Sequence, residues 1–345
     1  MNNAIKLAIM GAGVIGKRHM DIIGKEPNVD VCAIIDPSDD ALVYANSVGV
    51  PWFDNLSSML ANMVPDGIII ATPNQYHVSN TLEAVSAKIP ILLEKPIADH
   101  VEDAIKLVEA AENNHVSLLI GHHRRHNPLL QKAKEIITSG KLGNILAAHC
   151  MFWVMKPDDY FATPWRRAKG AGPVVVNMIH DIDCLRYLFG EVDSVQAVTT
   201  SKIRNFENEE NCGAILQFKS GIIATLSISD SITAPWSWDM SAQENAAFPQ
   251  YPENAYFIGG THGCLALPSL EYWTYNGERS WLNELARNRF EYQHIDPFIV
   301  QLRNFRDVIA NVAVPLVSGR EGLETLRTTL AVKEAALTAK TIYLN

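Results

Sequence analysis

The chain has 345 residues, of which 48% are hydrophobic and 19% charged, and its formal net charge is −9. This length favours two domains, and the composition is that of an ordinary globular enzyme. A net negative charge offers no basic field for phosphate backbones, so no nucleic-acid partner is expected. No apolar run approaches the roughly 20 residues that span a bilayer, so no membrane partner is expected either.

The cysteines and the N-terminus indicate a reducing compartment. The five cysteines are scattered and form no CxxC pair, which argues against a zinc site and against a disulfide framework. The first residues lack a basic segment followed by a long apolar one, so no signal peptide is expected. A cytoplasmic location is therefore predicted.

The first 120 residues alternate short apolar runs with amphipathic stretches. Strands are expected at Ile5–Met10, Val31–Ile35, Gly67–Ala71, Ile91–Leu93 and Val116–Ile120. Helices are expected at Val14–Gly24, Asn74–Ala87 and Val101–Asn113. Such alternation predicts an α/β Rossmann domain with a parallel, doubly wound sheet, assigned to residues 1–123.

The remaining residues, 124–345, are predicted to form an α+β domain with a large, mostly antiparallel, open sheet. Its expected strands are Ile145–Val154, Val192–Ile203, Cys212–Phe218, Ile222–Ser229, Ala255–Ile258 and Gly263–Leu267, with a turn at 219–221. Its expected helices are Pro128–Ser139, Val174–Phe189, Asp296–Ala310 and Glu321–Thr341. The two sequence textures meet near residues 121–128.

A glycine-rich motif opens the first expected helix. Gly11 allows a tight turn, Gly13 a close approach of a pyrophosphate, and Gly16 close packing of helix on strand. The amides around Val14 and Ile15, at the helix N-terminus, suit phosphates. The alternative, a glycine-rich turn that binds nothing, is disfavoured by this context.

Asp36 ends the second expected strand, where a carboxylate binds the ribose hydroxyls of a dinucleotide. The same carboxylate repels a 2′-phosphate, and neither Pro37 nor Ser38 offers a compensating charge. NAD is therefore the predicted cofactor, favoured over NADP.

Polar residues follow the next two strands, at the sheet edge where open α/β sheets bind ligands. They are Thr72, Pro73, Asn74 and His77 after one strand, and Glu94 and Lys95 after the other. Lys95 could donate a hydrogen bond to a substrate oxygen, although a lysine at a strand end is more often a solvated charge.

Seven segments, in order, resemble the Gfo/Idh/MocA oxidoreductases, which include glucose–fructose oxidoreductase and inositol dehydrogenase. They are GAGVIGKRH (11–19), ATPNQYH (71–77), EKP (94–96), GHHRRHNP (121–128), PWR (164–166), HDIDCLRYLFG (180–190) and GGTHGCLAL (259–267). The resemblance covers nearly the whole chain and is specific for fold and cofactor class, not for substrate.

The resemblance implies that Lys95 is catalytic and precedes a cis proline, that His180 is the family's histidine, and that Trp165 and Arg166 approach the cofactor. One position departs from the family pattern. Many members carry an aspartate four residues before the histidine, where this chain has Val176. Asn177 is the nearest polar residue, so whether it replaces the aspartate stays open.

The expected helix around His180 has a polar stripe on an otherwise apolar surface. Asn177, His180, Asp183, Cys184 and Tyr187 share this face by helical spacing. Asp183 could orient the His180 imidazole, while the competing interpretation is a core histidine bonded to Asp183. With the resemblance, a catalytic group of Lys95, His180, Asn177 and Asp183 is favoured.

The histidines at 122, 123 and 126 could suggest a metal site. His122 and His123 would point to opposite sides of an extended segment, and no acidic or cysteine partner is near in sequence, so no metal is predicted. For Arg124 and Arg125 a structural ion pair is favoured over contact with a ligand.

The predicted function is NAD(H)-dependent hydride transfer at a carbinol or carbonyl carbon of a small cyclic polyhydroxylated substrate, a sugar, cyclitol or dihydrodiol. His180 would exchange the hydroxyl proton and Lys95 would stabilise the oxygen. The alternatives are an NAD-dependent glycosidase and a non-catalytic dinucleotide-sensing regulator.

Two features of the second half bear on partners. Trp236 and Trp238, in an irregular segment at 233–255, could offer a ring platform to substrate, or could fill the sheet core or a subunit interface. His262 could approach the same pocket. The uncovered face of the open sheet predicts a homodimer or homotetramer.

Overall fold

The computed structural model describes residues 4–245 and 247–344. The chain forms two compact units. One contains the residues up to Asn127 together with Ile295–Leu326, and the other contains Pro128–His294 and the residues from Arg327 onward. The first unit therefore includes a segment that a single division between residues 123 and 124 assigns to the second domain.

The first unit is built on a six-stranded parallel sheet in the order β3-β2-β1-β4-β5-β6. Its strands are β1 (Ile5–Met10), β2 (Val29–Ile35), β3 (Trp52–Phe53), β4 (Gly67–Ile70), β5 (Ile91–Leu93) and β6 (Leu118–Ile120). This strand order is that of the doubly wound dinucleotide-binding fold, so the expected Rossmann architecture is confirmed.

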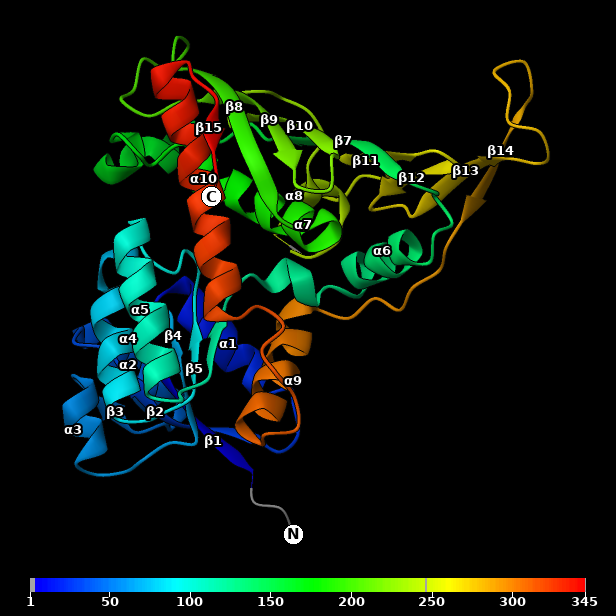
Figure 1. The fold of residues 1–345 in the computed structure, drawn as a ribbon. Helices are drawn as coiled ribbons and strands as arrows, with labels where there is room; N and C mark the ends of the chain where they lie inside the picture. The colour runs from blue at the N-terminus through cyan, green and yellow to red at the C-terminus, as the bar shows by residue number, and fades with distance from the viewer. Residues whose placement is uncertain (1–3, 246, 345) are drawn as a thin grey trace. The chain divides into compact units, whose positions relative to one another are not determined.

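Helices connect these strands, as Figure 1 shows. They are α1 (Val14–Ile23), α2 (Asp39–Val48), α3 (Leu56–Leu60), α4 (His77–Ser86) and α5 (Val101–Asn113), with 3-10 turns η1 (Asn74–Tyr76) and η2 (His123–His126). Helix α2 has a Ser38 cap and two aspartates in its first turn, the favourable charge for a helix N-terminus.

Helix α9 (Pro297–Ile309) joins the first unit through its apolar face. Leu302 and Phe305 on this helix pack against core residues of β1, β4 and β5, among them Leu7, Ile69 and Leu92. The helix begins at an Asp296 cap followed by Pro297. Proline suits this first position because it lacks an N–H, and an N–H there would have no partner within the helix. Burial of this face explains why a segment so distant in sequence belongs to the first unit.

The second unit is built on a nine-stranded sheet in the order β14-β13-β12-β11-β7-β10-β9-β8-β15. Its strands are β7 (Ile145–Trp153), β8 (Val192–Thr200), β9 (Asn211–Phe218), β10 (Ile223–Ser229), β11 (Tyr256–Gly260), β12 (Gly263–Leu267), β13 (Glu271–Tyr275), β14 (Leu285–Arg289) and β15 (Ile342–Tyr343). Neighbours pair antiparallel except β7 with β10. The predicted open sheet is therefore confirmed.

Helices cover one face of this sheet. They are α6 (Pro128–Thr138), α7 (Ile179–Phe189) and the short α8 (Trp238–Ser241), while α10 (Gly319–Thr338) precedes the last strand, β15. In Figure 1 α6, α7 and α8 lie on the same side of the strands. Strands β9 and β10 alternate buried and exposed residues, as a sheet with one covered face requires.

Several elements were not anticipated from the sequence. They are α2, β3, α3, α8, β13, β14 and β15, and most are short or polar on both sides. The helix expected at 174–189 begins instead with a π-helical turn over Val174–Met178. In the described part of the chain, no helix is both long enough and apolar enough to cross a membrane.

Candidate dinucleotide and substrate sites

The glycine-rich turn between β1 and α1 has no room for side chains at two of its glycines. Gly11 has φ +95°, and a Cβ there would lie 2.6 Å from the Ala71 carbonyl oxygen. A Cβ on Gly16 would lie 1.9 Å from the Gly11 carbonyl oxygen. Gly13 instead faces open space, with nothing within 4 Å of its Cβ position. The first and third glycines thus close the turn, and the second leaves a surface that a ligand can approach.

The N-terminus of α1 is open as well. Its cap residue, Gly13, makes no side-chain capping bond, and Val14 is 86% exposed. Backbone amides and the positive end of the helix dipole are therefore available to an anion. This geometry fits the pyrophosphate of a dinucleotide.

Asp36 lies at the end of β2 and is tied to that same turn. Its carboxylate accepts hydrogen bonds from the Ala12 N–H at 2.8 Å and from the Ser38 N–H and hydroxyl at 2.9 and 2.7 Å. Burial raises the pKa of Asp36, but these bonds outweigh it, so the pKa lies below its ordinary value. The group is thus an anion fixed beside the glycine loop.

A cavity of about 480 Å³ opens beside Asp36. Its lining includes Thr72 and Pro73 and three carboxylates, Asp36, Asp54 and Glu83. No lysine or arginine is among the described residues that line it. Its polarity suits the neutral hydroxyls of a ribose and disfavours a phosphate. Asp54 was missed because β3, which precedes it, is only two residues long. Glu83 lies on the expected helix α4, where a single glutamate gives no signal of a site.

Asn74 and His77 are close in sequence to Thr72 and Pro73, but neither is among the residues that line this cavity. Asn74 is exposed in the 3-10 turn η1, whereas the His77 ring is only 1% exposed. The two ring nitrogens of His77 lie 2.7 Å from the Pro96 carbonyl oxygen and 2.9 Å from that of Thr72. His77 therefore joins the loop after β4 to the loop after β5.

Glu94 and Lys95 follow β5, and the Lys95–Pro96 peptide is cis, as the resemblance implied. Glu94 is 7% exposed, with Oε1 2.8 Å from His19 Nε2 and Oε2 accepting from the Lys95 N–H at 3.3 Å. Burial raises the pKa of Glu94, but the His19 hydrogen bond and nearby positive charges bring it below its ordinary value. The Lys95 N–H is thus hydrogen-bonded to a buried carboxylate.

In the second unit, Asn177 belongs to the π-helical turn and His180 to the first turn of α7. Both are partly exposed, whereas Asp183 and Cys184 are buried, so the predicted polar stripe is open only in part. On the same helix Asp181 is fully buried and accepts a hydrogen bond from the Tyr256 hydroxyl. π-Turns of this kind occur frequently at functional sites.

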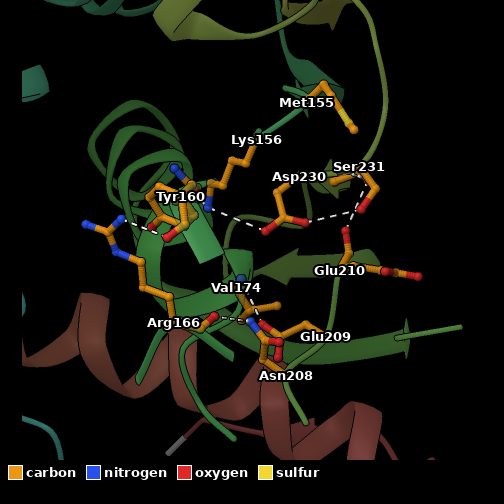
Figure 2. A network of polar contacts seen from close by, with 12 residues as sticks. Met155, Lys156, Tyr160, Arg166, Val174, Asn208, Glu209, Glu210, Asp230 and Ser231 are labelled. Atoms are coloured by element: carbon orange, nitrogen blue, oxygen red, sulfur yellow. Dashed lines mark hydrogen bonds and ion pairs between the residues drawn. The ribbon is translucent and has the colours of Figure 1, made fainter. Parts of the chain in front are cut away.

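Trp165 and Arg166 lie in the 3-10 turn η4 (Pro164–Arg167), and Trp165 is 57% exposed. The Arg166 guanidinium lies 4.1 Å from the Tyr160 ring centroid and donates to the Tyr160 carbonyl oxygen at 2.9 Å. Figure 2 shows the two side chains together. Arg166 is thus held in place from within its own unit.

A polar cluster beside this turn was not found from the sequence. Lys156 Nζ lies 2.9 Å from Asn177 Oδ1 and 3.5 Å from Asp230 Oδ2. The other Asp230 oxygen accepts from Arg204 Nη1 at 2.6 Å. Figure 2 shows Lys156 directed at Asp230. The only signal in the sequence was a lysine shortly after a strand, which by itself indicates nothing.

Three other candidate residues make contacts with side chains of the protein itself. Arg125 is 3% exposed and pairs with Glu321 at 2.8 Å, which is the favoured structural ion pair. Trp238 is fully buried in the sheet core, against Tyr256. Trp236 packs on Trp153 with ring centroids 5.7 Å apart, at one end of β7.

The suggestion that His262 approaches the Trp236 region is wrong. His262 lies in the turn between β11 and β12, where its N–H donates to the Leu142 carbonyl oxygen. That turn pairs with the start of β7 at Ile145, whereas Trp153 ends the same strand. The length of β7 separates the two residues.

The parallel sheet, the glycine turn and the acidic cavity define a dinucleotide-binding protein. A family model described as an oxidoreductase family with an NAD-binding Rossmann fold matches residues 5–122. The model of the Gfo/Idh/MocA C-terminal domain matches residues 130–266. The chain belongs to the Gfo/Idh/MocA family and is an NAD-binding oxidoreductase.

Individual relatives agree with this assignment. The rhizopine catabolism protein MocA of Rhizobium meliloti is 31% identical over 57% of this chain, which corresponds to only 61% of that protein. The 1,5-anhydro-D-fructose reductase of Ensifer adhaerens is 26% identical over 96% of both chains. An oxidoreductase from Agrobacterium radiobacter, solved with NAD+, L-tartaric acid and magnesium, has a TM-score of 0.83 at 20% identity, covering 99% of this chain and 98% of that one.

The acidic cavity leads to a prediction about cofactor choice. NAD(H) should bind at least roughly tenfold more tightly than NADP(H), about 1.4 kcal/mol, because the 2′-phosphate would face Asp36. Asp36→Asn should remove most of this preference, whereas Asp40→Asn, on the exposed start of α2, should not. Calorimetric titration of both cofactors measures this, and equal affinities in the wild type would exclude Asp36 as the ribose ligand.

Proposed function

We propose that the chain is an NAD(H)-dependent dehydrogenase or reductase acting on a carbinol or carbonyl carbon of a small cyclic polyhydroxylated substrate. The observation that supports this most is the nucleotide cradle of Gly11, Gly13 and Asp36, followed in the same sheet by a lysine on a fixed backbone. A bound nicotinamide ring would exchange a hydride with the substrate carbon. The protein must bind the cofactor and the substrate, orient them, and exchange the proton of the substrate hydroxyl.

His180 is the proposed acid–base residue. Its imidazole takes the proton of the substrate hydroxyl in oxidation and returns it in reduction, since histidine titrates near neutrality. Lys95 donates a hydrogen bond to the same oxygen and stabilises the charge that develops there. Asp183 is proposed to orient His180. The proposed cofactor side also includes Thr72, Pro73, Asn74, His77, Glu94 and Lys95, and Trp165 and Arg166 are proposed to approach the cofactor.

The substrate class rests on the names of relatives and on the polar groups of the second unit. The reductase of Ensifer adhaerens is named for an anhydro-sugar, and another relative, from Escherichia coli, is named a D-glucoside 3-dehydrogenase. Asn177 and His180 offer hydrogen-bonding groups of the kind that bind hydroxylated rings. Trp238 does not support a ring platform, because it is buried in the core, whereas Trp236 is 38% exposed.

We expect the purified protein with NAD to oxidise members of a panel of sugars, cyclitols and cyclic dihydrodiols, followed by absorbance of NADH at neutral pH. Linear 2-hydroxy acids and amino acids form the comparison panel. Turnover of the linear compounds alone would refute the substrate class. Release of a glycosidic leaving group without net NADH would identify the glycosidase alternative, and NAD binding with no turnover of any kind would favour a regulator.

Lys95→Met and His180→Ala should each lower kcat at least roughly 100-fold, given the usual size of such contributions. Affinity for NAD should change little in both variants, because most of the proposed contacts with the dinucleotide come from the glycine turn and Asp36. Stopped-flow turnover and calorimetry separate the two effects. Near wild-type rates in His180→Ala would make that histidine structural and would redirect attention to Asn177 or Tyr187.

We also propose that the open sheet face mediates a homodimer or homotetramer. A row across the face joins Phe257, His149, Thr225 and Ile215 through cross-strand pairs, and Ile215 and Phe257 are 43% and 44% exposed. Val198 and Ile223 extend the apolar surface. Such faces usually mark interfaces.

Light scattering at micromolar concentration should therefore give the mass of a dimer or tetramer. Ile215→Lys should shift the population toward monomer, since it places a charge among the exposed apolar side chains of this face. Val312→Lys, at an exposed position of the first unit, is the matched control and should have no effect. A monomeric wild-type protein would overturn the proposal.

A further inference from the structure

Lys156 is a largely buried lysine whose position is set by the backbone around it. Its N–H donates to the Asp230 carbonyl oxygen at 2.9 Å, and the Val154 N–H donates to that of Ser229 at 3.0 Å. The segment after β7 is thereby anchored to the end of β10. The Lys156 side chain is 11% exposed, and its amine lies 4.9 Å from the Tyr160 ring centroid.

The amine is held between an anion and an amide. Asp230, only 2% exposed, faces Lys156 with one oxygen and Arg204 with the other. Burial lowers the pKa of Lys156, and the Asp230 carboxylate opposes that shift. Arg204 also donates to the Lys156 carbonyl oxygen at 3.1 Å, so the lysine backbone and side chain belong to one buried network.

The contact with Asn177 determines which way that amide points. An ammonium group has three donors and no acceptor, so the atom that faces it must be the amide oxygen. Asn177 Oδ1 lies 2.9 Å from Lys156 Nζ, and this is the only hydrogen bond of the Asn177 side chain within the described residues. Its NH2 group is therefore directed elsewhere, on a partly exposed residue three positions before His180.

We propose that Lys156 is a positioning residue that fixes the Asn177 side chain as a hydrogen-bond donor to substrate. The substrate site then binds an acceptor oxygen next to the carbon that carries the hydroxyl whose proton His180 exchanges. Ring-ether, carbonyl and carboxylate oxygens meet this requirement. An aspartate at the same position would demand a donor from the substrate instead. This inference rests on the proposed function, because it assigns Asn177 to the substrate site.

Three kinetic comparisons test it. Lys156→Met and Asn177→Ala should each lower kcat/KM about tenfold or more, the usual scale for losing an oriented hydrogen bond. Because Lys156 acts through Asn177, kcat/KM of the double variant should be no lower than that of the more impaired single variant. Fully multiplicative losses, or a wild-type rate in Lys156→Met, would overturn the proposal. Lys202→Met, an exposed lysine of the same unit, is the control.

Asn177→Asp covers the case in which Lys156→Met fails to fold. The new carboxylate keeps the contact with Lys156 and replaces only the NH2 offered to substrate. Thermal stability should be retained, while kcat/KM falls about tenfold or more, mostly through KM. Unchanged kinetics would refute the donor role.

One measurement does not depend on turnover and so separates this proposal from the proposed function. The side-chain NH2 signals of Asn177, in protein labelled with 15N-asparagine, are assigned as those missing from Asn177→Asp. They should shift or broaden in Lys156→Met and stay in place in Lys202→Met. Unmoved signals in Lys156→Met would refute the positioning role, whether or not any substrate of the panel is turned over.

Discussion

The cofactor half of the molecule depends on the close approach of three backbone segments at the glycine turn. A Cβ on Gly16 would collide with the Gly11 carbonyl, and a Cβ on Gly11 would collide with the backbone after β4. Because both are glycines, α1 starts directly against the ends of β1 and β4. The Ala12 N–H in the same turn holds Asp36, which adds the end of β2. One tight turn therefore aligns three strand ends and the acidic cavity beside them.

The same helix also reaches Lys95. His19 lies in the middle of α1 and pairs with Glu94, whose second oxygen accepts a hydrogen bond from the Lys95 N–H. Glu94 has room only because the facing residue is Gly121, where a Cβ would lie 2.9 Å from its carboxylate. A buried carboxylate needs such partners, since an uncompensated one would be strongly destabilising. The dinucleotide helix and the backbone of the proposed catalytic lysine are thus linked through one buried carboxylate.

The predictability of each element followed the strength of its local pattern. Continuous apolar runs gave β1 and β5 with their observed bounds, and the glycine spacing located the nucleotide turn, since both signals are local. The membership of α9 in the first unit was not predictable, because Leu302 and Phe305 pack against core residues such as Leu7 and Leu92, which lie between 210 and 298 positions away in sequence. The hairpin of β13 and β14 has half-exposed or exposed residues throughout and so lacks the alternation that marks a strand.

The Lys156 network was invisible for a related reason. Its members come from four places: the segment after β7, the π-helical turn before α7, the turn before β9 and the end of β10. Only folding brings them together. Buried ion pairs of this kind contribute little net stability compared with apolar packing. Apolar side chains could also fill that space, but they could not hold an amide in one orientation. Arg204 and Asp230 therefore matter less as a source of stability than as the support that keeps an ammonium group pointed at Asn177.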